Sequence, residues 1–406
     1  MSLHVRPILS ALLRNRTGAV LVAMQVAITL AVLVNAVYIV VQRSEKIHRP
    51  TGIDVDNVLV IASAGFTQRF QIVPSLEEDL SWLRGLPGVI AATASSAIPL
   101  SDGGNNNSLV TRPDTQRDEY YNEINVDEQG LDALGLHLVA GRNFRHDEIN
   151  PPHTKQDVSS FEPQIIVSRA LAQHLFPGQN PVGKTVYDIL NHTTTIIGVV
   201  DPIMGCFPSH EHPDWVYFTP RKPSSLYGSV KYLVRTRPGQ RDAVIRLAEA
   251  HLSKSNPDRV VDWVRPLTYF RNLSYLDDRS MQIYLLTVTA LLISVTCLGI
   301  FALATFNVSN RTKQIGTRRA VGARRRDIVR YFLAENALIT SAGVLVGCAL
   351  ALGAGYWLSV QYSLPRLNLY YLVGGVLTLW AIGQLAAWQP ARKASGVSPS
   401  VATRTV

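Results

Sequence analysis

The sequence predicts an α-helical membrane protein with four transmembrane helices and a large α+β extracytoplasmic domain inserted between the first and second helices. The first observation is that four stretches, each 23 to 25 residues long, contain no charged residue. About 20 helical residues are enough to cross the hydrocarbon core of a bilayer. The second observation is that the 240 residues between the first and second stretches alternate patterns typical of strands and helices. We expect the transmembrane helices at 19–42, 283–306, 335–360 and 367–390.

Basic residues predict the orientation of these helices, because cytoplasmic loops carry an excess of Lys and Arg. Residues 1–18 contain three arginines and no acid, and the 391–406 tail contains three Lys/Arg and no acid. The 307–334 loop contains eight Lys/Arg and one acid. We therefore expect both termini and this loop in the cytoplasm and residues 43–282 outside, in a multi-pass protein of the inner (plasma) membrane.

The charge balance also limits the partners. The 43–282 domain has 24 Lys/Arg and 28 Asp/Glu, so the formal charge of +9 for the whole chain comes from the cytoplasmic face. A basic face beside a bilayer indicates contact with the lipid membrane and with a cytoplasmic partner protein. The balance gives no support to nucleic-acid binding.

The first helix is expected to be an uncleaved anchor that follows a cytoplasmic amphipathic segment at 1–18. Five Leu and Ile residues between positions 3 and 13 favour a short interfacial helix. The uncharged stretch after it is longer than the apolar region of a typical cleaved signal peptide.

The two ends of the outer domain repeat one strand–helix–strand pattern. The first set is a strand at 57–63, a helix opened by a capping box from Ser75 to Glu78, and a strand at 88–96. The second set is a strand at 230–236, a helix at 240–253 and a strand at 259–265. Two such units at the ends of one domain predict a split α+β module whose termini both point at the membrane.

Between these units we expect a mostly β part. Strand patterns occur at 164–167, 193–200 and 215–219, and Ser168 is expected to cap a short helix. The polar segment 101–108 has no apolar anchor and is expected to be a mobile loop. The outer domain has a single cysteine and therefore no internal disulfide.

Two motifs in the outer domain resemble chemical sites. Gly178 to Thr185 has the letters of a phosphate-binding loop, but a helical pattern precedes it and a strand-like run follows, the reverse of the order that such a loop needs. We therefore expect a turn. The second motif is Cys206, His210 and His212, where His-x-His on an extended segment would place both rings on one side. Zinc or copper binding is left open there, and no metal site is assigned.

No catalytic set is visible in the sequence. Neither H-E-x-x-H nor G-x-S-x-G occurs. We expect no enzyme activity, no catalytic residue and no cofactor in this chain.

The third transmembrane stretch carries small residues four positions apart, at Gly343, Gly347, Ala351 and Gly355. These positions lie along one face of a helix, and small faces let helices approach closely in lipid. We expect helix packing there, either within the chain or with a second copy.

Four segments resemble one family. Residues 311–323 resemble the signature of the FtsX-like permeases, the membrane subunits of the macrolide-exporter (MacB) and lipoprotein-releasing (Lol) class of ABC transporters. Residues 134–144 and 175–184 are similar to that family's periplasmic core domain, and 390–399 to its closing segment. The resemblance covers nearly the full length of the chain.

The resemblance implies an architecture and partners. The family has one transmembrane helix, a periplasmic domain with a porter-like part and an inserted β-rich part (about 140–225 here), and then three helices. Its permeases work as dimers, with a second copy or a paralogue, and with cytoplasmic ABC ATPase subunits. A periplasmic adaptor is a further candidate partner. Closure of the ATPases would press on the 307–334 loop and so move the periplasmic domain.

The residues that the resemblance assigns to ATPase coupling are Arg311, Lys313, Ile315, Gly316, Arg318, Arg319, Gly322 and Ala323. The two glycines would allow tight turns around a short coupling helix, and Arg318 and Arg319 would meet acidic groups on the ATPase. The alternative is that the basic residues only anchor the loop at anionic lipid. Gln314 departs from the family, which commonly has Glu there. The best-known macrolide exporter carries its ATPase on the same chain, whereas here a separate subunit is expected.

Two functions are weighed. The leading hypothesis is a permease subunit that exports or extracts a substrate, which predicts an apolar groove in the outer domain. The alternative is a mechanotransmitting signalling or scaffold protein that regulates an envelope enzyme or senses antimicrobial peptides without transport. A membrane-anchored hydrolase is the weakest hypothesis. The substrate stays open among macrolides, peptides, lipoproteins and siderophores, and so does the choice between homodimer and heterodimer.

Overall fold

The structure is a computed structural model that describes residues 16–67, 69–113, 115, 119–152, 162–188, 190–223, 229–362 and 367–398. Contacts divide the chain into two compact units. The membrane unit comprises Met1–His48 and Asp277–Val406, and the outer unit comprises Arg49–Leu276. Most of the amphipathic segment expected at 1–18 lies outside the described residues.

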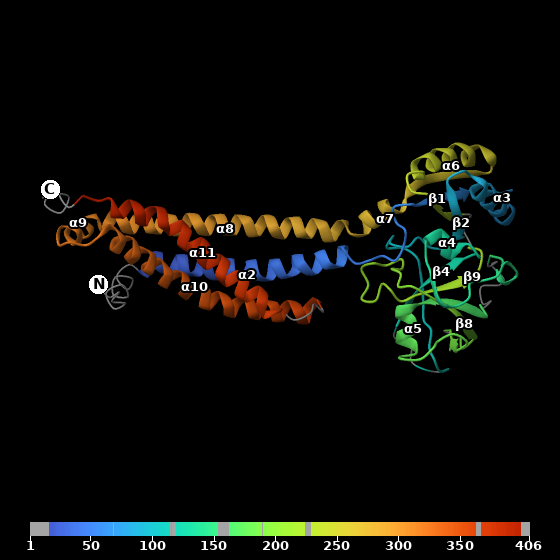
Figure 1. Cartoon of the computed structure of the whole chain (residues 1–406), viewed down its shortest axis with the longest axis horizontal. Coiled ribbons are helices and arrows are strands. Elements are labelled where there is room, and N and C mark those ends of the chain that lie inside the picture. The colour runs from blue at the N-terminus through green and yellow to red at the C-terminus, as the bar shows by residue number, and fades with distance from the viewer. Residues whose placement is uncertain are drawn as a thin grey trace. The chain divides into compact units, whose positions relative to one another are not determined.

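In the part of the membrane unit that the structure describes there are four long apolar helices, which confirms the predicted fold class (Figure 1). They are α2 (Arg16–Ile47), α8 (Leu276–Asn310), α10 (Arg325–Tyr362) and α11 (Leu369–Ser395). Each is long and apolar enough to cross a membrane. A short helix, α9 (Thr312–Ala320), connects α8 to α10. Both α8 and α10 begin before the uncharged stretches, because polar residues with good helix propensity continue a helix beyond the hydrocarbon core.

The first helix, α2, is the most buried of the four. Half of its most apolar window is buried, against 17% for α8. Leu30 of α2 belongs to an apolar cluster with Ile339 of α10 and Leu379 of α11. The contact between α2 and α8 includes a polar pair, since the hydroxyl oxygens of Thr29 and Thr296 lie 2.8 Å apart.

Four antiparallel strands form the first sheet of the outer unit, in the order β11-β1-β10-β2. The elements are β1 (Val58–Gly65), α3 (Ile72–Gly85), β2 (Val89–Ser95), β10 (Ser229–Thr236), α6 (Arg241–Ser255) and β11 (Arg259–Pro266). Because β1 pairs with both β10 and β11, the strands of the two predicted units interleave. Leu80 of α3 and Ala248 of α6 pack with Ile61 and Tyr232 of the sheet. The strands of the two predicted strand–helix–strand units thus form one sheet, with the two helices packed on it.

A second, mixed sheet contains seven strands in the described part of the chain. They are β3 (Asn105–Asn107), β4 (Tyr121–Val126), β5 (Leu138–Gly141), β6 (Gln164–Ser168), β7 (Thr185–Tyr187), β8 (Thr193–Val200) and β9 (Val216–Pro220). Their order is β3-β4-β9-β6-β8-β5, with β7 paired to β8. The boundary that we expect at about residue 140 therefore falls inside this sheet. The short helices are α4 (Gly130–Leu134), the 3₁₀ helix η1 (His146–Glu148), α5 (Arg169–Leu175) and α7 (Leu267–Ser274), which leads into α8.

Two local predictions about the outer unit are wrong. Helix α3 begins at Ile72 with Gln71 at its N-cap, and no side chain caps it. Ser75 is buried, and its Oγ accepts a hydrogen bond from Asn256 Nδ2 at 3.1 Å, so a partner distant in sequence takes the place of the capping box. The segment 101–108 is not a free loop, because it contains β3, which pairs with β4.

The cap of α5 agrees with its prediction. The Oγ of Ser168 accepts a hydrogen bond from the Leu171 N–H at 3.2 Å. The same oxygen donates to the Asp214 carbonyl at 2.6 Å, which ties the start of α5 to the strand that follows in the sheet. A local capping signal is thus readable where the capping side chain and the N–H that donates to it lie within one turn.

Candidate functional site

The basic loop between α8 and α10 folds into a compact module that we call the α9 module. Ile315 of α9 packs against Ile328 and Phe332 of α10 and against Ala391 and Ala394 of α11. None of these five side chains is more than 6% exposed. An amphipathic helix of nine residues is too short to be stable alone, so this apolar contact is what holds it. The α9 module therefore joins the ends of three membrane helices.

Two predicted coupling residues of this module are held by side chains of α10. Arg311 lies at the N-cap of α9, and its Nη1 donates a hydrogen bond to Glu335 Oε2 at 2.9 Å. The side chains of Arg311 and Glu335 are 17% and 3% exposed. The guanidinium carbon of Arg318 lies 4.7 Å from the ring centre of Tyr331, a cation–π contact.

A third coupling residue ties the module to the end of α11. Nη1 of Arg319 donates a hydrogen bond to the carbonyl oxygen of Val397. Val397 is partly buried against the same apolar cluster that holds Ile315. The segment just after α11 is therefore part of the module.

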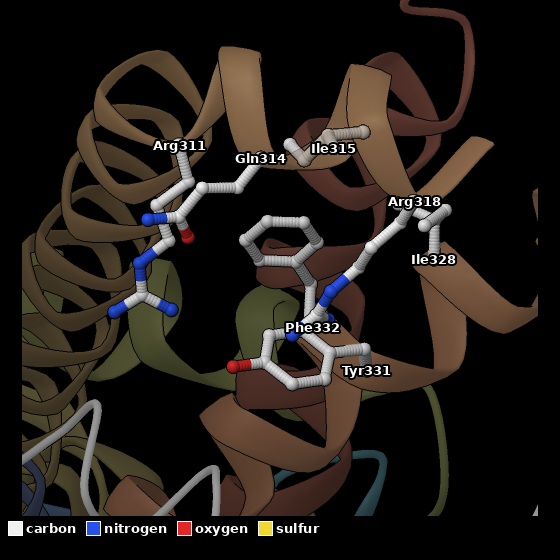
Figure 2. Close-up of a pocket in the computed structure, with 7 residues that line it drawn as sticks. All are labelled: Arg311, Gln314, Ile315, Arg318, Ile328, Tyr331 and Phe332. Atoms are coloured by element: carbon white, nitrogen blue, oxygen red, sulfur yellow. The ribbon is translucent and has the colours of Figure 1, made fainter. Parts of the chain in front are cut away.

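A small pocket of about 20 Å³ lies between α9 and the first turns of α10 (Figure 2). It is lined by Arg311, Gln314, Ile315, Arg318, Ile328, Tyr331 and Phe332. Figure 2 shows Arg311 and Arg318 on opposite sides of the pocket. Gln314 is exposed beside them, and its neutral amide both donates and accepts hydrogen bonds. Any contact made through this position is therefore not ionic.

The turn after α9 requires glycine at position 322. Its φ is 103°, a backbone region that disfavours a side chain. The Gly322 N–H donates to the Arg319 carbonyl at 3.2 Å, and the Ala323 N–H donates to the Arg318 carbonyl at 3.0 Å. This pair of bonds is the Schellman motif, which ends a helix with a left-handed residue. Gly316, in contrast, is buried inside α9 and forms no turn.

The remaining predicted coupling residues differ in exposure. Lys313 is exposed on α9, and Ala323 is half-buried. In the described part of the chain, five basic residues of the loop besides Arg318 are exposed and form no ion pair. They are Lys313, Arg324, Arg325, Arg326 and Arg330.

The small residues of α10 face α2 of the same chain. A Cβ at Gly343 or Gly347 would lie 2.6 Å or 3.0 Å from a backbone carbonyl oxygen of α2. Ala351 is fully buried, and its carbonyl accepts a hydrogen bond from Asn35 Nδ2 at 3.1 Å. A Cβ at Gly355 would lie 3.1 Å from Asn35 Oδ1. These four positions bring the backbones of α2 and α10 together.

In the outer unit, one loop contacts both segments that continue into membrane helices. This loop, 202–206, follows β8. On the α2 side, the Met204 N–H donates to the Thr51 carbonyl at 2.9 Å. A Cβ at Gly52, whose φ is 72°, would lie 2.0 Å from a carbonyl oxygen of the loop. On the α8 side, the Tyr275 hydroxyl donates to Met204 Sδ at 3.6 Å.

The motif that resembles a phosphate-binding loop is a turn, as predicted. It lies between α5 and β7, and both Gly178 and Gly183 have positive φ values. The Lys184 ammonium lies 4.5 Å from the ring centre of Phe176. A helix before the turn and a strand after it give no helix N-terminus that faces a phosphate.

The structure does not bring the side chains of Cys206, His210 and His212 together. Cys206 is fully buried, and burial raises the pKa of its thiol to about 12. His210 stacks on Phe207 and His212 on Trp215, with ring centres 4.8 Å and 3.7 Å apart. Within the described residues, no group of three or more His, Cys, Asp or Glu could hold a metal ion.

Sequence reasoning missed three parts of the α9 module: Glu335, Tyr331 and the end of α11. Glu335 had a readable signal, because it is the one acid that borders the uncharged stretch of α10, and an acid so close to a membrane span needs a partner. The likeness of residues 390–399 to the family's closing segment was the signal for α11. Tyr331 had none, because a tyrosine beside a basic loop is common.

Two family models cover most of the chain. The model of the MacB-like periplasmic core domain matches residues 19–251. The model of the FtsX-like permease C-terminal region matches residues 286–399, which include α9 and its contacts on α10 and α11.

Relatives carry related names. The Macrolide export ATP-binding/permease protein MacB of Azoarcus sp. (strain BH72) is 27% identical over 252 residues, 61% of this chain and 38% of the relative. The uncharacterized ABC transporter permease YknZ of Bacillus subtilis (strain 168) is 24% identical over 336 residues, 81% of this chain and 78% of the relative. Thus the chain spans well under two thirds of this MacB relative.

A solved structure is similar to part of the chain. The periplasmic region of MacB from Actinobacillus actinomycetemcomitans matches with a TM-score of 0.35 and 16% identity, over 56% of this chain and 97% of that one. The periplasmic core model alone matches more than half of the chain, and the permease model matches the three helices after it. The chain therefore belongs to the family of MacB-like ABC transporter permeases.

Proposed function

We propose that the chain is the permease subunit of a MacB- or Lol-type ABC transporter. A separate cytoplasmic ABC ATPase docks on the α9 module, and ATP hydrolysis moves the outer unit to export or extract a substrate. Both termini and the 307–334 loop lie in the cytoplasm, and the outer unit lies in the periplasm. The relative named YknZ, an ABC transporter permease matched over 78% of its own length, supports the separate-subunit arrangement.

The observation that carries the proposal is that contacts with α10 and with the end of α11 hold α9 in place, which we call the bracing of α9. Arg311 links the junction of α8 and α9 to Glu335 of α10, and Arg319 links α9 to Val397 after α11. Ile315 fills the apolar contact among the three helices. A force applied to α9 is therefore passed to membrane helices instead of being absorbed by a flexible loop.

Bracing changes the roles that we assign to the basic residues. Arg311 and Arg319 are internal contacts, whereas Lys313 and the turn at Gly322 are exposed to a docking partner. Arg318 is exposed while it stacks on Tyr331, so it is oriented for a partner carboxylate. The contact with the ATPase then consists of the outer side of α9 and the turn after it.

Movement reaches the second sheet of the outer unit through the 202–206 loop. The segment that leaves α2 and the segment that enters α8 both bond to this loop, at Met204. The loop directly follows β8, which pairs with β5, β6 and β7. A shift of either segment relative to the other therefore pulls on the strands of that sheet.

A second permease copy or a paralogue completes the transporter. The side of α8 that carries Tyr284, Val288, Leu291, Val295 and Leu298 is exposed, and these positions are spaced by four and three residues. This spacing suits a seam between two helices, and we assign the dimer contact to it. A periplasmic adaptor is a further proposed partner of the outer unit.

Co-purification with an ATPase tests the proposal. The tagged full chain is expressed with candidate ABC ATPase subunits, extracted in mild detergent and assayed for bound ATPase and ATP hydrolysis. Lys313→Glu and Gly322→Asp are expected to reduce both, because they alter the exposed docking surface. Lys254→Glu, which changes an exposed lysine of α6 by the same charge, is the matched control and is expected to behave as wild type.

The outcome also separates the two candidate functions. ATP-dependent release or transport of a substrate by the reconstituted complex supports a transporter. Nucleotide-driven movement of the outer unit without any substrate movement supports the signalling protein instead. If no ATPase binds and none is stimulated, the proposed coupling is wrong.

A further inference from the structure

The basic residues of the 307–334 loop fall into two groups that face different ways. Ile328 and Phe332 point from α10 towards α9. Arg326 and Arg330 are one helical turn apart on one side of α10, and Ile328 follows Arg326 by two positions, about 200° around the helix. A protein docked on α9 therefore leaves the side of Arg326 and Arg330 free.

These two arginines have no partner in the described part of the chain. Both are exposed, and neither takes part in an ion pair or hydrogen bond of its side chain there. The one acid of the loop, Asp327, is already used, because its Oδ2 accepts a hydrogen bond from the Arg324 N–H at 3.1 Å. Arg325 adds a further exposed positive charge in the same turn.

The position of the two arginines along α10 places them at the bilayer surface. Arg330 precedes the uncharged stretch that begins at Asn336 by six residues and Arg326 by ten, which are about 9 Å and about 15 Å along a helix. Each headgroup layer is roughly 5–8 Å thick. The Debye length at physiological salt is about 8 Å, so both charges lie within reach of headgroup phosphates.

We propose that Arg326 and Arg330 bind the phosphate groups of anionic phospholipids at the cytoplasmic surface of the bilayer. Guanidinium groups bind phosphate through two parallel hydrogen bonds, which makes arginine suited to this contact. Positive side chains in the first turns of a helix are unfavourable next to its positive end, and an external anion relieves this. The same loop thus meets a protein on its α9 side and lipid on the other.

The test is lipid retention by the full-length chain. The protein is placed in nanodiscs that contain equal amounts of phosphatidylcholine and phosphatidylglycerol, and the lipids that stay bound on release are identified by native mass spectrometry. Wild type is expected to retain phosphatidylglycerol preferentially. Arg326→Gln/Arg330→Gln is expected to lower that preference roughly thirty-fold, which equals about 2 kcal/mol at about 1.4 kcal/mol per factor of ten.

Two further variants and one condition complete the test. Arg246→Gln/Lys254→Gln removes the same charge from exposed positions of α6 and is expected to keep the wild-type preference. Arg326→Lys/Arg330→Lys keeps both charges and is expected to keep most of it. Raised salt is expected to abolish the preference of wild type, a measurement that needs no variant.

The results that overturn the proposal are distinct from those that overturn the ATPase contact. An unchanged phosphatidylglycerol preference in the glutamine variant refutes lipid binding. If that variant instead loses a co-purifying ATPase while its lipid preference is unchanged, the two arginines belong to the protein interface. A lipid preference that depends on them, with no ATPase bound under any condition, leaves this proposal standing and removes the proposed function.

Discussion

The ion pair between Arg311 and Glu335 predicts how much stability the membrane unit loses when either residue is replaced, and which replacement costs more. The two side chains are 17% and 3% exposed, and Glu335 Oε1 has no hydrogen-bond partner among the described residues. Removing one member of a buried ion pair costs about 3–5 kcal/mol, because the other charge is left without compensation. Arg311→Gln leaves the more deeply buried charge behind, whereas Glu335→Gln leaves a guanidinium that is partly in water. We therefore expect Arg311→Gln to be the more destabilising change.

A double-mutant cycle measures this prediction on the full chain in detergent. Thermal unfolding of the membrane helices is expected to shift down by roughly 6–20 °C for Arg311→Gln, at about 2–4 °C per kcal/mol for a unit of this size. Glu335→Gln is expected to shift it less. The double variant Arg311→Gln/Glu335→Gln is expected to recover part of the loss, since it removes both charges.

Arg324→Gln serves as the matched control, because Arg324 is exposed and forms no ion pair in the described residues. It is expected to unfold within about 0.5 kcal/mol of wild type. Additive losses in the double variant, or an Arg311→Gln variant as stable as this control, would refute the reasoning that the pair braces the α9 module.

The other predictions concern three further positions. Gly322→Ala is expected to lower the free energy of unfolding by about 1–2 kcal/mol, since alanine disfavours a positive φ. Its control is Gly353→Ala, in an open position on α10, which is expected to be neutral or stabilising in the same thermal assay. Gly52→Ala is expected to destabilise the outer unit far more than Gly239→Ala. Both glycines have a positive φ, but only at Gly52 would an added Cβ meet another atom within 4 Å. Equal losses of unfolding free energy in chemical denaturation would argue against the contact between Gly52 and the 202–206 loop. A third variant has the other two cysteines replaced by alanine. In it the buried Cys206 thiol is expected to resist labelling by maleimide at mildly alkaline pH until the protein unfolds, because burial raises its pKa to about 12. Rapid labelling of the folded protein would contradict the burial of Cys206.

The membrane helices and the split module were predictable because their signals are local. A run of 23 to 25 uncharged residues and a strand–helix–strand pattern can each be read without knowing what lies elsewhere in the chain. The cap at Ser168 is of the same kind, because the N–H that donates to its hydroxyl oxygen is only three residues away.

Predictions failed where a residue takes a distant partner. Ser75 has the local pattern of a cap, but its hydroxyl bonds to Asn256 instead. In the candidate site, the residue types of the coupling loop were predictable. Which of its basic residues make internal contacts and which are exposed to a partner was not. Whether Arg319 reaches an external carboxylate or the Val397 carbonyl depends on where α11 ends, which no spacing in the loop encodes.

The seam between α2 and α10 has a consequence for the order of biosynthesis. Asn35 is buried in the first membrane helix, and one of its hydrogen-bond acceptors, Ala351, is made 316 residues later. At about 5–20 residues per second, roughly 16–63 s of translation separate the two. During that time the amide has only the Ala31 carbonyl of its own helix, at 2.9 Å. The first helix therefore enters the bilayer with an incompletely bonded amide, and the close approach of α2 and α10 is completed only after the third helix has been inserted.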